Sequence, residues 1–107
     1  MDIDAEDAKL VTLAKASRAR IGANAGAAVR DQDGRTYSAA SIDRPSLSIS
    51  ALDLAVAMAL SSGAARLEAA AVSCESDCEI DSQAARDLAQ PGAVLVLASP
   101  SGELREV

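Results

Sequence analysis

Histidine, tryptophan and phenylalanine are absent from this chain of 107 residues, and Tyr37 is its only aromatic residue. Without histidine, a serine such as Ser50 has no imidazole to activate it as a nucleophile. A zinc ion would likewise lack one of the side chains that bind it best. A single aromatic ring also leaves little to stack on nucleic-acid bases. These absences argue against serine hydrolases, histidine-ligated zinc sites and nucleic-acid-binding proteins.

Positive charge is scarce as well, because 10 Lys and Arg residues stand against 16 Asp and Glu residues, for a net charge of −6. No basic cluster is present to contact phosphates, so nucleic acid is not an expected partner. No apolar run approaches the roughly 18 uncharged residues of a membrane span. The start of the chain, residues 1–7, is acidic and unlike a basic signal-peptide start. We therefore expect a soluble cytoplasmic protein without a membrane partner.

Cysteine is limited to Cys74 and Cys78, which cannot form the framework of a disulfide-rich secreted domain. A reducing compartment is the simpler interpretation. We expect two ordinary thiols, Cys74 at a strand end and Cys78 in a solvated acidic loop. The alternative is a relocated metal site with Asp77 and Glu79, for which two thiols would need further ligands.

The length of the chain predicts one domain, residues 1–107, with a single modest core. Half of the residues are hydrophobic, so disorder is not expected. The core must consist of Ala, Val, Leu and Ile side chains, which bury little area each and contribute correspondingly little stability. Oligomerisation is one way for such a chain to recover the shortfall, and we expect a homo-oligomer.

Capping residues and apolar periodicity predict three helices and four or five strands. Asp4 and Asp81 can cap the first and third helices, and Ser46 or Ser48 the second. The Pro91-Gly92 pair should end the third helix. In chain order, the predicted elements are the helix 4–21, the strands 24–30 and 35–41, the helix from 46 or 48 to 61, the strand 67–73, the helix 82–90, the strand 93–98 and a possible last strand 103–107.

The arrangement of these elements can also be predicted. Residues 31–34 carry an Asp-Gly hairpin signal, and residues 41–45 should form a loop because Pro45 disfavours helical geometry before it. The second helix is apolar nearly all round, which indicates burial on more than one side. The strand 67–73 is apolar on both faces and should be interior. The order α-β-β-α-β-α-β, with a possible last β, predicts an α/β fold, a three-layer α-β-α sandwich with a mixed sheet.

Several segments, in this order, resemble the cytidine deaminase family. Residues 25–28 (Ala-Gly-Ala-Ala) are similar to its Val-Gly-Ala-Ala segment, and residues 33–38 to its Asp-Gly-Arg-Ile-Tyr-Thr hairpin. Residues 67–72 resemble the strand after the central helix of the family, and residues 94–96 the end of its core. The resemblance extends from about Ala8 to Val107. It implies a cytidine deaminase-like fold and an oligomer, a dimer or a tetramer.

The same resemblance implies where a zinc site and its proton-transferring glutamate would lie. The family takes one zinc ligand from Cys/His-Ala-Glu and two from Pro-Cys-x-x-Cys. Here Ser50 aligns with the first ligand, and Ser82 and Ala85 align with the two cysteines. Leu52 aligns with the glutamate and cannot move a proton. The catalytic positions are therefore degenerate, and we expect neither a zinc cofactor nor catalytic residues.

The substrate-binding segment is also altered. The family's Asn-x-Glu, which holds the ribose hydroxyls, aligns with Ser41-Ile42-Asp43, so Ser41 and Asp43 are weak candidates for ligand binding. Ala23 replaces a Phe of the family. We expect a pseudoenzyme with a hydrolase fold that acts as an oligomeric binding or scaffold module. The alternatives are a zinc-dependent cytidine or nucleoside deaminase with ligands from Cys74 and Cys78, and a nucleoside-binding protein without chemistry.

Overall fold

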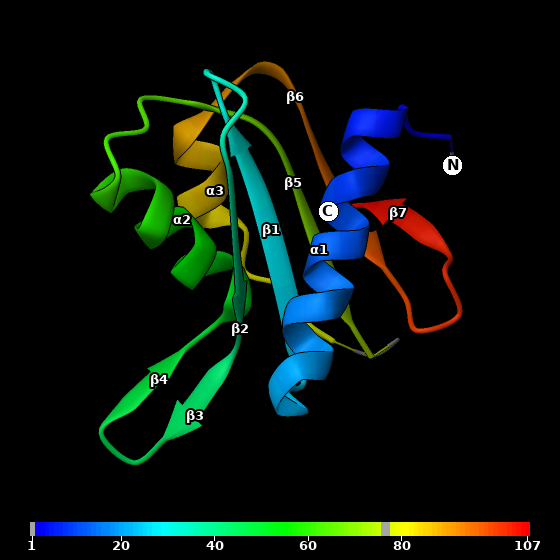
Figure 1. Ribbon diagram of the computed structural model, residues 1–107, viewed down its shortest axis with the longest axis vertical. Coiled ribbons are helices and arrows are strands. Elements are labelled where there is room, and N and C mark those ends of the chain that lie inside the picture. Colours follow the sequence, from blue (N-terminus) through cyan, green and yellow to red (C-terminus); the bar gives the residue numbers. More distant parts are fainter. Residues whose placement is uncertain (1, 76–77) are drawn as a thin grey trace.

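The computed structural model describes residues 2–75 and 78–107 (Figure 1). Its centre is a mixed five-stranded sheet in the order β2-β1-β5-β6-β7. The strands β5 and β6 are parallel, and the other neighbouring pairs are antiparallel. The predicted interior position of residues 67–73 is confirmed, because β5 is the middle strand. The five strands are β1 (Ala25–Asp31), β2 (Thr36–Ala40), β5 (Leu67–Cys74), β6 (Ala89–Ala98) and β7 (Leu104–Glu106).

Helices cover both faces of this sheet, so the predicted three-layer sandwich is confirmed (Figure 1). The helix α1 (Ala5–Ile21) packs on one face, and the helices α2 (Ala51–Ser61) and α3 (Gln83–Leu88) pack on the other. Side chains of β1 alternate between the two cores, as the pleat of a strand requires: Ala28 belongs to the α1 side, and Ala27 and Val29 to the α2 side. Most of the buried hydrophobic side chains are alanines.

The helix α1 and the strand β1 lie so close together that only glycine fits at position 26. A Cβ atom built on Gly26 would lie 2.0 Å from the Ala14 carbonyl oxygen and 2.8 Å from the Arg18 nitrogen, both of which are backbone atoms of α1. Backbone cannot move aside as a flexible side chain can. Gly26 therefore fixes the distance at which the first helix packs on the sheet.

The ends of α1 match their prediction. The Asp4 side chain accepts a hydrogen bond from the Asp7 amide at 2.8 Å, and Gly22 ends the helix in the left-handed conformation with φ 64°. Asp7 is itself buried, and its carboxylate pairs with Arg30 at 2.9 Å. Arg30 also lies 3.7 Å from Glu68, so this ion network joins α1 to two strands of the sheet.

The segment predicted as a loop after Ser41 is a β-hairpin, which corrects that prediction. Two three-residue strands, β3 (Ile42–Arg44) and β4 (Leu47–Ile49), pair in a separate two-stranded sheet. The hairpin extends away from the main sheet, with its turn at Pro45 and Ser46 (Figure 1). Because β4 occupies residues 47–49, α2 begins only at Ala51. Neither Ser46 nor Ser48 caps it.

The prediction for α2 was also wrong about its burial. One face of the helix packs on the sheet, whereas Met58 and Leu60 on its other side are exposed. The helix is thus an outer layer and not an element enclosed on several sides. None of the helices in the described part of the chain is long and apolar enough to span a membrane.

The third helix is shorter than predicted. It ends at Leu88, and the strand β6 begins at Ala89, so Pro91-Gly92 lies inside a strand instead of ending the helix. The pairing register between β5 and β6 shifts in this stretch, which accommodates a proline that has no N–H to donate. At the start of the helix, Ser82 occupies the cap position, but its side chain does not accept a capping hydrogen bond from a backbone amide. The carboxylate of Asp81 instead accepts from the Gln83 amide at 3.1 Å.

The β1–β2 turn, predicted from its Asp-Gly pair, is held by the buried carboxylate of Asp31. This carboxylate accepts hydrogen bonds from the amides of Asp33 at 2.9 Å and Arg35 at 3.0 Å, and from the Tyr37 hydroxyl at 3.1 Å. Burial raises the pKa of Asp31, but these hydrogen bonds and the Arg35 charge outweigh burial and leave the pKa below its ordinary value of 3.8. The ionised form is the one that stabilises the turn.

This arrangement predicts an acid-sensitive contribution to stability. Asp31→Asn should lower the free energy of unfolding at pH 7 by about 1.5–3 kcal/mol, because hydrogen bonds to a charged acceptor are lost. Since the pKa is lower in the folded state, the contribution is complete above the unfolded value of about 4 and fades as pH falls through the folded value. The difference between wild type and Asp31→Asn, measured by urea unfolding, should shrink accordingly. The exposed Asp33→Asn is the matched control, and an equal pH dependence in both variants would contradict the assignment.

Candidate functional site

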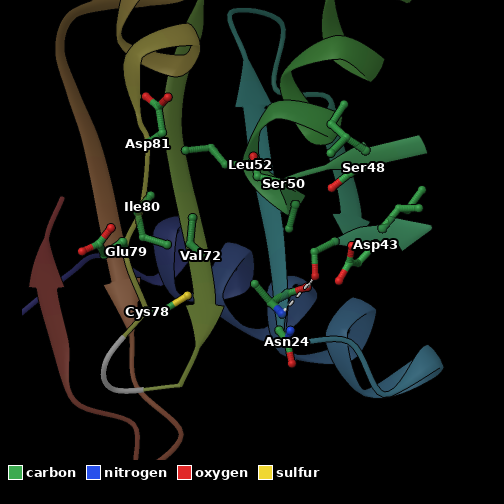
Figure 2. Close-up of a pocket in the computed structure, with 15 residues that line it drawn as sticks. Asn24, Asp43, Ser48, Ser50, Leu52, Val72, Cys78, Glu79, Ile80 and Asp81 are labelled. Atoms are coloured by element: carbon green, nitrogen blue, oxygen red, sulfur yellow. Dashed lines mark hydrogen bonds between the residues drawn. The ribbon is translucent and has the colours of Figure 1, made fainter. Parts of the chain in front are cut away.

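A cavity of about 330 Å³ lies at the N-terminal end of α2 (Figure 2). Its opposite sides are the hairpin β3–β4 and the segment 78–81, and the starts of α2 and β1 complete the wall. The cavity exists because the hairpin projects from the sheet edge just before the helix begins. Its lining residues are Asn24, Ala25, Ser41, Ile42, Asp43, Ser48, Ile49, Ser50, Ala51, Leu52, Val72, Cys78, Glu79, Ile80 and Asp81.

Ser50, the predicted counterpart of the first zinc ligand, lies on this wall as the N-cap of α2. Its hydroxyl oxygen accepts a hydrogen bond from the Asp53 amide at 3.1 Å, and its carbonyl accepts from the Leu54 amide at 3.0 Å. The hydroxyl therefore satisfies an amide of the first turn that has no backbone partner, and the carbonyl accepts the first hydrogen bond of the helix. The side chain acts in the local structure of the helix end.

Leu52 and Ala85 belong to the apolar core, and the Leu52 side chain also lines the cavity. Leu52 is 3% exposed and Ala85 is fully buried, and both belong to the cluster that α2 and α3 form on the sheet. Figure 2 shows the Leu52 side chain lying between Ser50 and the segment that carries Asp81. An aliphatic group thus occupies the place where the resemblance puts a proton-transferring glutamate.

Ser82 does not line this cavity. It lines a neighbouring cavity of about 490 Å³, which shares Cys78, Glu79 and Ile80 with the first. Its hydroxyl oxygen accepts a hydrogen bond from the Arg86 guanidinium at 2.8 Å. The structure thus places Ser50 and Leu52 on one cavity, Ala85 in the core with Leu52, and Ser82 on the adjoining cavity.

The two weak candidates for ligand binding, Ser41 and Asp43, both line the cavity. The Ser41 hydroxyl donates to the Ala25 carbonyl at 3.3 Å and accepts from the Ala25 amide at 3.2 Å, so it ties the end of β2 to the start of β1. Asp43 is exposed on β3, and its side chain lies beside the opening (Figure 2). Of the two, Asp43 is the better placed to contact a bound molecule.

Sequence reasoning missed other polar residues of the wall. Asn24 and Ser48 were not identified as site residues, Glu79 was named only as a possible ligand of a relocated metal site, and Asp81 was interpreted only as a helix cap. Ser48 faces the cavity because of the unpredicted hairpin, and no local pattern marks it. With Asp43, Glu79 and Asp81 on its wall and no lysine or arginine there, the cavity is acidic.

The residues present do not fit a zinc ion. The three aligned positions offer two hydroxyls that already hold hydrogen bonds and one methyl group, whereas zinc takes thiolate, imidazole or carboxylate ligands. Within residues 2–75 and 78–107, no three His, Cys, Asp or Glu side chains gather closely enough to hold a metal. Asp77, named above as a possible ligand beside Cys74 and Cys78, lies outside the described residues. Burial, together with its contact with Cys78, raises the pKa of the Cys74 thiol to about 12.

Comparison with known proteins defines the class to which this fold belongs. Residues 3–102 match the model of the family described as cytidine deaminase-like. The chain therefore belongs to the cytidine deaminase-like family. No curated protein sequence is significantly similar to it.

Solved cytidine deaminases share the fold at low sequence identity. The enzyme from Burkholderia pseudomallei is 22% identical with a TM-score of 0.75, and the match covers 94% of this chain and 90% of that one. The enzyme from Mycobacterium leprae is 20% identical with a TM-score of 0.68, over 96% and 94% of the two chains. A mutant cytidine deaminase from Mycobacterium tuberculosis is 24% identical with a TM-score of 0.69, over 98% and 92%. At these identities the likeness establishes the fold alone.

Proposed function

We propose that this chain is a non-catalytic member of the cytidine deaminase-like family that acts as an oligomeric binding or scaffold module. The observation that carries the proposal is the set of groups at the four aligned catalytic positions. The hydroxyl oxygens of Ser50 and Ser82 accept hydrogen bonds within the fold. Leu52 and Ala85 are core side chains. No group among them supplies a metal ligand of useful strength or transfers a proton, so no step of hydrolysis is assigned to the site.

All four aligned catalytic positions carry residues without the family's catalytic chemistry, and not one position alone. Removal of a general acid or base alone costs about 10²–10⁴ in rate. Removal of the metal as well eliminates the activated hydroxide that such an enzyme needs. Each of the four positions instead has a structural role in the fold, Ser50 and Ser82 through hydrogen bonds and Leu52 and Ala85 in the core.

Metal content and turnover of the purified chain test this proposal. We expect no stoichiometric zinc by mass spectrometry and no loss of cytidine absorbance on incubation. A variant that carries Ser50→Cys, Leu52→Glu, Ser82→Cys and Ala85→Cys is the matched control, and it should bind zinc if the positions are aligned correctly. Circular dichroism verifies that the variant is folded. Stoichiometric zinc together with deamination in the wild-type chain would refute the proposal.

A second candidate, nucleoside binding without chemistry, is favoured by the persistence of the cavity. Small-molecule sites usually occupy about 300–1,000 Å³, and this cavity of about 330 Å³ lies at the lower end of that range. Asp43 can accept hydrogen bonds from hydroxyl groups of a ligand at its opening. The half-buried apolar residues Ile42, Ile49 and Ile80 offer a surface for a planar base.

Thermal unfolding with added nucleoside tests the second candidate. A ligand that binds the native state alone must stabilise it, by about 2.7 kcal/mol at a hundredfold excess over Kd. Millimolar cytidine should therefore raise the unfolding temperature by several degrees, and Asp43→Asn should abolish most of the shift. The exposed Asp33→Asn, on the remote β1–β2 turn, should retain it. No shift in the wild type at millimolar cytidine would remove this candidate.

The oligomeric part of the proposal rests on exposed apolar side chains. Leu60 and Met58 on α2 are 52% and 38% exposed, and Leu47 on β4 is 56% exposed. A core made largely of alanine gains little from burial within one chain, so covering these side chains between copies would add stability. Sedimentation velocity at micromolar concentration should show a dimer or tetramer. A monomer under these conditions would contradict this part of the proposal.

A further inference from the structure

The two cysteines meet at one backbone oxygen atom, the carbonyl of Glu75. The Cys74 thiol donates to this oxygen at 3.2 Å, and the Cys78 amide donates to it at 3.0 Å. Glu75 is held in place from outside the turn, because its carboxylate pairs with Arg18 of α1 at 2.5 Å. These hydrogen bonds place Cys78 next to Cys74.

Cys78 also packs against the buried cluster that contains Cys74. The Cys74 sulfur and the Cys78 amide nitrogen lie 3.2 Å and 3.0 Å from the same Glu75 oxygen, so the two residues lie side by side. A disulfide needs Cβ atoms about 3.5–4.5 Å apart, a separation that two cysteines held at one oxygen atom can reach. The pair is therefore arranged for an intramolecular bond and not for two independent roles.

The surroundings of the two sulfur atoms differ. Cys74 is fully buried at the end of β5, and burial keeps its thiol protonated. Cys78 is half-buried and lines both neighbouring cavities, where a small oxidant can reach it. Exposure controls which cysteine reacts first, so Cys78 is the accessible thiol and Cys74 the second one.

We propose that Cys74 and Cys78 form a reversible thiol–disulfide pair that hydrogen peroxide oxidises, with Cys78 as the site of attack. The Cys78 sulfur attacks the O–O bond, which yields a sulfenic acid on Cys78 and one water molecule. The Cys74 sulfur then attacks the Cys78 sulfur, and the sulfenic oxygen leaves as a second water with the proton of Cys74. Two thiols lose two electrons in total, and the peroxide takes them.

Mass spectrometry of the full chain after peroxide treatment tests the pair. Arg66 and Arg86 bound a tryptic peptide that holds both cysteines, so it should carry two alkyl groups before oxidation and none afterwards. Cleavage after Glu75 separates the cysteines, and the two fragments should stay joined until a reductant is added. Intermolecular disulfides, or peptides with one alkyl group as the main product, would overturn the proposal.

Two single variants separate the roles of the cysteines. In Cys74→Ala, which leaves a small apolar side chain in the core, Cys78 should stop at the sulfenic acid and react with a 1,3-dione probe. In Cys78→Ser, at the half-buried position, the Cys74 thiol should survive the same peroxide treatment. Loss of the Cys74 thiol at the wild-type rate in Cys78→Ser would refute Cys78 as the site of attack. So would the absence of probe labelling in a folded Cys74→Ala variant.

Discussion

The close approach of α1 to β1 is the constraint on which the rest of the structure depends. Gly26 lets the helix backbone lie almost on the strand, since a Cβ atom there would lie 2.0 Å from the Ala14 carbonyl oxygen. On the opposite face, Ala27 and Val29 of the same strand belong to the core beneath α2. A chain with no Phe or Trp can fill its interior only if its layers lie close together, because packing density must be maintained with small side chains.

The same close packing explains the state of the candidate site. Once α2 and α3 rest on an alanine-rich sheet, the space between their first turns is filled by Leu52 and Ala85. Ser50 completes the helix end, and the β3–β4 hairpin encloses the cavity beside it. The family's architecture is therefore preserved, while the side chains at the aligned catalytic positions stabilise the fold. The cavity that remains is acidic and partly apolar, and it is distinct from the packed core behind it.

Much of the fold could be predicted from the sequence, because many of its determinants are local. Asp4 and Gly22 bound α1 through hydrogen bonds within a few residues, and the Asp-Gly turn forms between adjacent strands. The β3–β4 hairpin escaped prediction because three-residue strands are too short to show alternation. The Pro91-Gly92 pair was misassigned for a different reason. Pairing of β6 with the distant β5 keeps these residues in a strand despite their preference for a turn.

The candidate site was predictable only in part. The aligned positions of Ser50 and Leu52 were identified from the family resemblance, and both residues line the cavity. Ser82 could not be placed on its own cavity from the sequence, since that depends on how the segment 78–81 passes over the sheet edge. Glu79 and Asn24 come from segments far apart in the chain. Only the packing of those segments brings their side chains to one wall.

The sequence by itself determined the order of the helices and of the strands in the main sheet, and it excluded imidazole from any site in the chain. It also determined that no strong zinc ligand stands at the three aligned positions, because side-chain chemistry does not depend on folding. Only the tertiary structure decided that a cavity survives beside those positions and that two cysteines meet at the Glu75 carbonyl. Such features arise from contacts between segments distant in sequence and from the exact course of a turn, neither of which local residue preferences specify.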